Sequence, residues 1–598
     1  MARKAKRARP KLDARLAFLL SLSARQRDAL KVEEDTRLAA VGKEIAATSK
    51  ALYQGTESAR KLAAEKLREL DQRLFAPLTT GLFVPREKQR GKARFFRTDE
   101  PFVSASILSD ASAGDLQALG ARVRSQAGDV FTAFIPLSAI PRLEKSAAVR
   151  YIELARPLFP ALNDAVPQAQ LDTLHAGPPA VDGTGVIVGV IDDVLDVYHP
   201  DFRTAGNASR VLFLWDQKLS RQSGESAPSV GTATYGVEYS QADIDAELNH
   251  PAPAYQVVRH RGKFQAHGTH VTGIAAGNGR ASVGSGVNYV GAAPKADVIF
   301  VAGAVATAAE HDETPYADNT FVLDAFRYIF AHAAALGQPC VVNLSNSDNQ
   351  GAHDGTSLGE QFLDNLLLTP GRAIVLSAGN SNTSASHAAG NVTTGVGNTV
   401  DLVLRYNAGT NVSDAVEIWY DGHDRFDVTV TLPSGASTGV VGPGVSAPPL
   451  NAGGIVVQVT SVLNDPRNGD NVISIIFVVP TGQSIPTGNT TIRLAGTAVV
   501  NGAFHAWVDR NNRGRSFFTT FLQEGTLTLG VPATARRAIT VGNHDKVAPP
   551  GIYKTSGRGP SRDGRVKPEI ATVGMGLDDS HGVHAPQGED RTSNRGGA

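Results

Sequence analysis

The sequence predicts an α/β protein built on a mostly parallel sheet, with a β-rich insertion in the sheet domain and a small α+β domain before it. A continuous apolar run at 186–191 is typical of a strand buried on both faces. A second, mostly apolar strand pattern stands at 341–344, and a helical pattern at 320–336 lies between the two. Short β patterns separated by Gly-, Pro- and Asn-rich turns fill 396–530, which indicates a β-sandwich or jelly roll. Residues 96–165 alternate strand and helix patterns on a smaller scale.

These changes in hydrophobic pattern divide the 598 residues into five segments. In order, they are a basic tail with a helical region at 1–95, the α+β domain at 96–165, the first part of the sheet domain at 166–395, the β-rich insertion at 396–530 and the second part of the sheet domain at 531–598.

The first segment shows no chemistry of its own. Its basic tip at 3–11 is typical of a solvated tail, with an arm for an anionic surface as the alternative. Residues 12–75 are rich in Ala, Leu, Arg, Lys and Glu and predict one or two helices. The apolar run at 16–24 resembles the core of a signal peptide, but the charges of Asp13 and Arg15 favour an amphipathic helix. The sequence therefore leaves a cytoplasmic and a secreted location open.

The overall composition excludes several classes of function. Its 58 basic and 58 acidic residues cancel, so no global charge favours nucleic acid. We expect no transmembrane segment, and nothing in the pattern indicates an oligomeric state. The single cysteine, Cys340, excludes an intrachain disulfide and is typical of a small buried hydrophobe.

The α+β domain has the element order of a ferredoxin-like unit, with one strand fewer than that fold needs. An unrelated packing domain is the alternative. We predict strands at 102–108, 130–135 and 149–153, with helices at 113–120 and 138–145 between them.

Polar residues with complementary chemistry stand at the ends of predicted strands. Asp192 closes the run at 186–191, and Asn380 follows another apolar run at 373–376. His267 opens a stretch of small residues suited to a buried helix. Because parallel strands end at one edge of a sheet, we expect the acid, the base and the amide donor to lie at that edge.

The segment from Gln265 to Gly277, which contains His267-Gly-Thr-His-Val, and the order acid, histidine, amide resemble the subtilisin-like serine proteases, or subtilases. Val194 departs from the family pattern, which has glycine there. Further similar stretches lie at 199–202, 290–298, 341–347 and 565–570.

The resemblance implies a role for each residue at this edge. Asp192 would orient the imidazole, His267 would be the general base, and Asn380 would donate its amide to the oxyanion. Asn343 and Ser345 lie in the stretch similar to the family's substrate-binding strand, and so would bind a polypeptide substrate. The domain at 96–165 looks like the family's propeptide, and calcium is common in the family, although no dense acidic loop predicts a metal site here.

The nucleophile is the exception to this match. The family's Gly-Thr-Ser-Met-Ala segment does not occur in the sequence. In one alignment Gly597-Ala598 match the residues before the serine; in the other, Ser593 is the nucleophile, without the usual small neighbours. The first alignment predicts an endopeptidase whose sequence ends before its nucleophile. The alternatives are an inactive homologue that binds peptides along 341–345 and an enzyme that uses Ser593.

Overall fold

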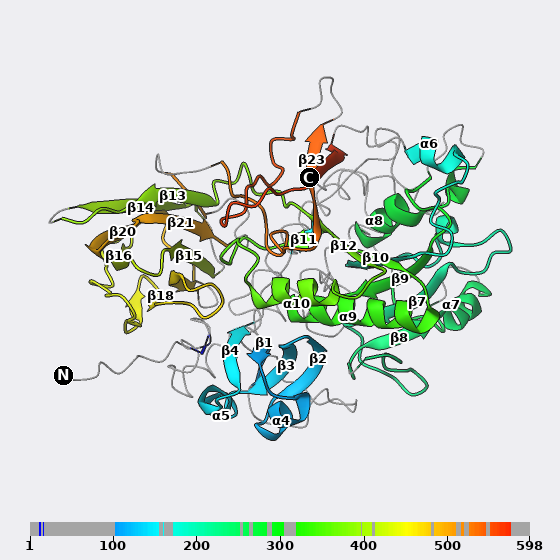
Figure 1. Ribbon diagram of the computed structural model, residues 1–598, viewed down its shortest axis with the longest axis horizontal. Helices are drawn as coiled ribbons and strands as arrows, with labels where there is room; N and C mark the ends of the chain where they lie inside the picture. Colours follow the sequence, from blue (N-terminus) through cyan, green and yellow to red (C-terminus); the bar gives the residue numbers. More distant parts are fainter. Residues whose placement is uncertain are drawn as a thin grey trace.

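The computed structural model describes residues 11–12, 16, 102–154, 159–160, 171–231, 233–250, 255–261, 267–283, 290–303, 319–395, 398–408, 413–479, 483–509, 516–519, 525–545 and 551–575. The predicted helices at 12–75 and the tail with Ser593 fall almost wholly outside these residues. Figure 1 shows a helix-covered sheet domain on one side, a β-rich part on the other, and a small domain, in blue, beneath the helices. Within the described residues, no helix is both long and apolar enough to cross a bilayer.

The sheet domain is built on eight strands in the part of the chain that the structure describes. They are β6 Ile187–Asp192, β7 Val211–Asp216, β8 Val237–Ser240, β9 Asp297–Ala302, β10 Cys340–Leu344, β12 Arg372–Ser377, β23 Ile539–Asp545 and β24 Ile570–Met575. Their order is β24-β23-β12-β10-β6-β9-β7-β8, and only β7 and β8 pair antiparallel. The chain first adds strands on one side of β6 and then crosses to the other. The end of β6 is therefore the switch point at which such sheets bind ligands.

Helices cover both faces of β6, which explains why its sequence is continuously apolar. Ile187 and Ile191 pack in one core with helices α9 and α10, whereas Val188 and Val190 pack in another with helix α8. Gly189 allows close packing of α9, because a Cβ there would lie 2.6 Å from Ile329. The helices of this domain are α6 Leu171–Ala176, α7 Gln241–Leu248, α8 His267–Ala276, α9 Asn319–Leu336 and α10 Leu358–Leu366, with short 3₁₀ turns η1 Pro200–Phe202 and η2 Arg280–Ser282.

The small domain contains a fourth strand that the sequence did not predict. Its elements are β1 Phe102–Ser109, α4 Ala113–Ala118, β2 Arg122–Ala127, β3 Val130–Pro136, α5 Ile140–Lys145 and β4 Val149–Leu154. The missed strand, β2, is polar in sequence, and Gly128 with a φ of +60° turns the chain into β3. The antiparallel order β2-β3-β1-β4 supplies the strand that a ferredoxin-like unit needs. Figure 1 shows this sheet lying beneath α9 and α10.

The β-rich insertion consists of two facing sheets around their own apolar core. One sheet begins with a strand at 387–391, so the insertion starts before the predicted boundary at 396. The first sheet has the order β13-β21-β15-β19-β18-β17 and the second β16-β20-β14-β22. The strands are β13 His387–Asn391, β14 Thr399–Tyr406, β15 Asp414–Tyr420, β16 Arg425–Thr431, β17 Leu450–Ala452, β18 Ile455–Val462, β19 Asn471–Val478, β20 Gly488–Ala498, β21 Ala503–Val508 and β22 Ser516–Phe518.

Two tryptophans of the insertion pack where it meets the sheet domain. Trp419 and Trp507 are each only 1% exposed and share an apolar cluster with Ala352. Trp507 also stacks on His353, with ring centroids 4.0 Å apart. Both indoles therefore pack against the sheet domain, and they form no exposed binding surface.

Candidate active site

The acid and the histidine named from the sequence contact each other. Asp192, the last residue of β6, is fully buried, and His267 is the first residue of α8. Nδ1 of His267 lies 2.8 Å from Oδ1 of Asp192, so the carboxylate holds the ring with its proton on Nδ1. Nε2 has no hydrogen-bond partner among the described residues. One imidazole nitrogen is thus oriented by an acid while the other is available to accept a proton.

The glycine after the histidine sets the distance between α8 and β6. A Cβ on Gly268 would lie 2.5 Å from the carbonyl oxygen of Val194 and 2.7 Å from the Phe300 ring. No other residue has a side chain small enough for this gap. The His-Gly order therefore places the imidazole directly beside the end of β6.

The loop after Asp192 is tied to α8 without the glycine that the family has at position 194. Asp193 accepts hydrogen bonds from the amides of Gly268 at 2.7 Å and of Val194 at 2.5 Å. The Asp196 amide donates to the hydroxyl of Thr269 at 2.8 Å. Val194 is buried and is not among the residues with positive φ, so this turn does not need glycine.

Burial and neighbouring charges shift the pKa values of three side chains at this site. Burial opposes the charge on His267, but the charge and hydrogen bond of Asp192, together with the charge of Asp193, raise the pKa of His267 to about 9. Burial and then the charge of Asp192 raise the pKa of Asp193 to about 7. Burial and then the charge of His267 lower the pKa of His270 to about 4. The site therefore stabilises the imidazolium of His267, and Nε2 accepts a proton only in the neutral ring, which prevails above a pH of about 9.

A second histidine–aspartate pair, which the sequence analysis missed, supports the same loop. Nδ1 of His260 lies 2.7 Å from Oδ2 of Asp216, and both side chains are buried. Nε2 of His260 accepts the amide of Leu195 at 3.0 Å. The ammonium of buried Lys218 donates to the carbonyl of Asp193 at 3.1 Å. Asp216 also ends a strand, so the strand-end rule that identified Asp192 could have found it.

Asn380 follows the carboxyl end of β12, on the edge of the sheet where β6 ends. Its side chain is half-buried. The turn before it needs Gly379, whose φ is +88°. The amide of Gly530 donates to the carbonyl of Ala378 at 3.0 Å, and the amide of Gly557 donates to that of Gly379 at 2.7 Å. The amide side chain is therefore mounted on a turn fixed by two neighbouring segments.

The residues named for substrate binding hydrogen-bond each other. The amide of Asn343 donates to the hydroxyl of Ser345 at 2.9 Å, and Ser345 is fully buried. Asn343 lies inside β10, between β6 and β12, so its backbone belongs to the sheet. The next residues, β11 Asn346–Ser347, pair antiparallel with β5 Phe159–Pro160. An extended segment therefore already lies along 346–347.

The structure leaves two predictions at this site untested. Ser593 lies outside the described residues, so its position relative to His267 is not defined. Calcium binding likewise stays a prediction. Among the described residues, no group of three or more His, Cys, Asp or Glu side chains is placed to hold a metal ion.

Comparison with known proteins agrees with this geometry. The model of the subtilase family, Peptidase S8, matches residues 183–408. Among solved structures, the chain is similar to the CspB protease of Clostridium perfringens, with 25% identity and a TM-score of 0.56 over 68% of this chain and 78% of that one. No curated protein sequence matches the chain. Residues 183–408 therefore match the subtilase family, the subtilisin-like serine peptidases.

Proposed function

We propose that the chain is an endopeptidase that hydrolyses peptide bonds through a serine nucleophile. The observation that supports this most strongly is the Asp192–His267 contact, with Nε2 of His267 unpartnered in the described structure. In the reaction, Nε2 takes the proton of the serine hydroxyl as its oxygen attacks the peptide carbonyl, and later gives it to the leaving amine. Asp192 holds the ring and stabilises the imidazolium. The amide of Asn380 donates to the oxyanion.

The substrate class follows from the pairing at 346–347. The antiparallel bridge from β11 to β5 is the geometry in which an extended peptide adds to a strand. A polypeptide substrate would occupy the place of 159–160 and present its next peptide bonds towards His267. In this proposal 159–160 blocks the site until it is displaced.

Ser593 is the candidate nucleophile within this sequence, and fluorophosphonate labelling with peptide mapping tests it. The reagent modifies a serine efficiently only where a base and an oxyanion site activate it. A label on Ser593 that disappears in His267→Ala and in Ser593→Ala would support Ser593 as the nucleophile. A label on Ser593 that persists in His267→Ala would contradict the proposed role of the histidine.

The second candidate function is peptide binding without hydrolysis. It is favoured by the same β11–β5 pairing, because that contact needs no nucleophile. A chain shown to be folded that takes no label, yet binds extended peptides in competition with a synthetic 155–164 peptide, would support this candidate over the endopeptidase.

A further inference from the structure

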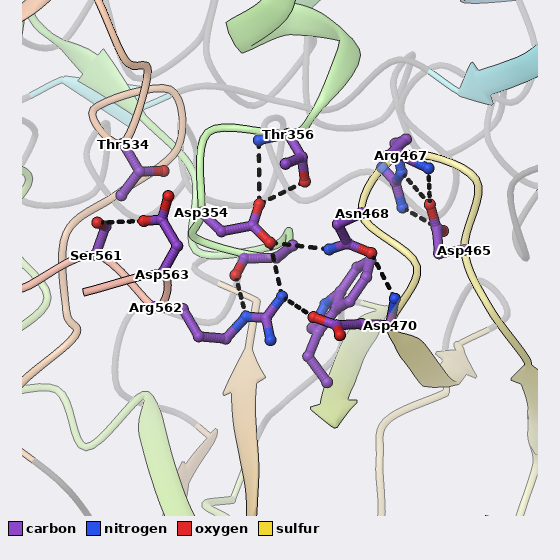
Figure 2. Close-up of polar contacts among 12 residues, drawn as sticks. Asp354, Thr356, Asp465, Arg467, Asn468, Asp470, Thr534, Ser561, Arg562 and Asp563 are labelled. Atoms are coloured by element: carbon purple, nitrogen blue, oxygen red, sulfur yellow. Dashed lines mark hydrogen bonds and ion pairs between the residues drawn. The ribbon is translucent and has the colours of Figure 1, made fainter. Parts of the chain in front are cut away.

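The loop between β18 and β19 of the insertion, residues 463–470, contacts two other parts of the molecule. On one side it reaches the sheet domain, as Figure 2 shows. The amide of Asn468 donates to Asp354 at 2.9 Å, and Asp470 lies 2.6 Å from the guanidinium of Arg562. Arg562 also pairs with Asp354 at 2.7 Å. This side of the loop joins the insertion to the sheet domain.

Arg467, on the other side of the loop, is held in place by its own loop. Its Nε and Nη2 atoms lie 2.8 and 2.9 Å from the two carboxylate oxygens of Asp465, a bidentate pair. Its backbone amide donates to the same carboxylate at 2.9 Å. The guanidinium also lies over the ring of Trp419, 5.3 Å from its centroid. The arginine is therefore oriented by groups of the insertion itself, which reduces the entropy lost when it binds a partner.

The partner of Arg467 is the small domain. Its Nη1 atom lies 3.3 Å from Oε1 of Glu153, and its guanidinium lies 4.8 Å from the ring centroid of Tyr151. The side chains of Arg467 and Glu153 are 4% and 2% exposed. The second oxygen of Glu153 accepts the amide of Leu358, at the start of α10, at 2.8 Å. One carboxylate of the small domain is thus bound by the insertion and by the sheet domain together.

Apolar contacts extend the same surface. Ile476 and Val478 of β19 belong to the apolar cluster that forms the core of the small domain, together with Ile152 of β4. Leu12 lies in that cluster as well, and the amide of Ile152 donates to the carbonyl of Lys11 at 2.8 Å. The insertion therefore meets the small domain with a buried cation beside an apolar patch, the pattern of a specific interface.

We propose that this surface, Arg467 with Ile476 and Val478, is the binding site through which the insertion retains the 102–154 domain on the folded protein. The small domain then stays bound when the chain connecting it to the sheet domain is cut. The small domain also has polar contacts outside the insertion, among them Arg124 with Asp324 of α9 at 2.9 Å and Asn365 of α10 with the carbonyl of Ala127 at 3.2 Å. The insertion thereby acts as a clamp for a neighbouring domain, whether or not the active site hydrolyses peptides.

The size of the effect follows from the burial of the pair. Removing one member of a buried ion pair leaves the other without its partner in a low-dielectric site and is strongly unfavourable. We therefore expect Arg467→Met to weaken retention about a hundredfold or more. The double variant Glu153→Gln with Arg467→Met should lose less than the sum of the single variants, because the amide carries no charge that needs the guanidinium.

The test cuts the connection without using the chain's own activity. A recognition sequence for a site-specific protease is placed within 161–170 of a full-length His267→Ala chain. After cleavage, size-exclusion chromatography with light scattering shows whether the two fragments travel together, and dilution gives the dissociation constant. We expect one complex for the parent, and a hundredfold or greater weakening for Arg467→Met. Arg493→Met is the matched control, because Arg493 forms an exposed pair with Asp401 in the same insertion.

Three outcomes would overturn the proposal. Fragments of the parent chain that separate on cleavage would show that the small domain is not retained. An Arg467→Met complex as tight as Arg493→Met would show that the insertion does not hold it. Additive effects of Glu153→Gln and Arg467→Met would show that the pair is not coupled. If Arg467→Met does not fold, Glu153→Gln removes the charge of the same ion pair from the side of the small domain. Cleavage of the parent chain tests retention of the small domain without any substitution in the ion pair.

Discussion

At the scale of single residues, Asp193 gives this site a second carboxylate next to the acid that orients the histidine. The carboxylate of Asp193 accepts hydrogen bonds from the backbone amides of Gly268 and Val194, so it holds the loop against α8. It also places a second negative charge near His267. His267 is the group that responds, because its pKa is raised to about 9 in the presence of both acids. Asp193 is thus a positioning residue that also sets the ionisation of the base.

Replacing Asp193 with Asn should lower the pKa of His267. The amide keeps an acceptor for the amide of Gly268 but removes a negative charge that favours the imidazolium. The measurement is an NMR titration of the ¹⁵N-labelled His267 ring, which needs no enzymatic activity. Asp401→Asn, on the surface of the insertion, is the control and should leave the titration unchanged. An equal pKa in Asp193→Asn and the parent would contradict this account.

At the scale of elements, α8 and β6 are placed together by a glycine contact. A methyl group on Gly268 would meet the carbonyl oxygen of Val194 at 2.5 Å, so the start of α8 has to move away from β6. We expect Gly268→Ala to destabilise the fold by about 1–3 kcal/mol, the usual cost of overpacking. The Asp192–His267 hydrogen bond should break as well, because both ends of the contact are carried by these two elements.

Thermal unfolding and the low-field NMR signal of the His267 Nδ1 proton measure the two effects. Gly551→Ala is the matched control, since a Cβ there has nothing within 4 Å and should change neither readout. An intact Nδ1 signal in a destabilised Gly268→Ala chain would show that α8 tolerates the shift without losing the pair.

The elements also show where a sequence pattern fails. The strand β2 was missed because Arg122–Ala127 is mostly polar, and its residues Arg124 and Ser125 face a buried polar network on α9 that only the tertiary fold provides. The insertion begins earlier than predicted because β13 contains Ala389 and Gly390 and has no strong β propensity. Its pairing with β21, more than 100 residues away, makes it a strand.

At the scale of the whole molecule, the ionisation of His267 predicts how stability changes with pH. Its folded pKa of about 9 lies above the ordinary value of 6.5, so the folded state holds a proton that the unfolded state loses in this range. The stabilisation is complete below pH 6.5 and is lost as the pH rises through about 9. The free energy of unfolding should therefore fall by up to about 1.4 kcal/mol per pH unit between pH 7 and 9.

Unfolding temperatures across this range measure the effect, with His267→Gln as the comparison. The variant should lose less stability between pH 7 and 9 than the parent, because glutamine does not titrate. Parallel pH profiles for the two chains would rule out this role for the Asp192–His267 pair. Below pH 7 two sets of side chains act in opposite directions. Burial lowers the pKa values of half-buried His270 and buried His353 to about 4, whereas burial raises the pKa values of Asp193 and Glu360 to about 7.

The sequence by itself determined the α/β class and the interruption by a β-rich insertion, which follow from local hydrophobic patterns and turn residues. The pairing of Asp192 with His267 was predicted by the resemblance to the subtilases, with both residues placed at the edge where parallel strands end. The subtilase resemblance rested on the same segments, and the match to residues 183–408 confirmed it.

Only the tertiary structure decided the contacts between distant segments. Three contacts illustrate this, and they join residues 65 to 314 positions apart in the sequence. They are the pairing of 346–347 with 159–160, the hydrogen bond between His260 and the amide of Leu195, and the buried ion pair of Arg467 with Glu153. Single polar residues and short paired segments such as these carry no periodic signal, so nothing in the linear pattern indicates their partners. Their roles depend on burial, because a charge acquires a strong and specific partner only where folding removes it from water.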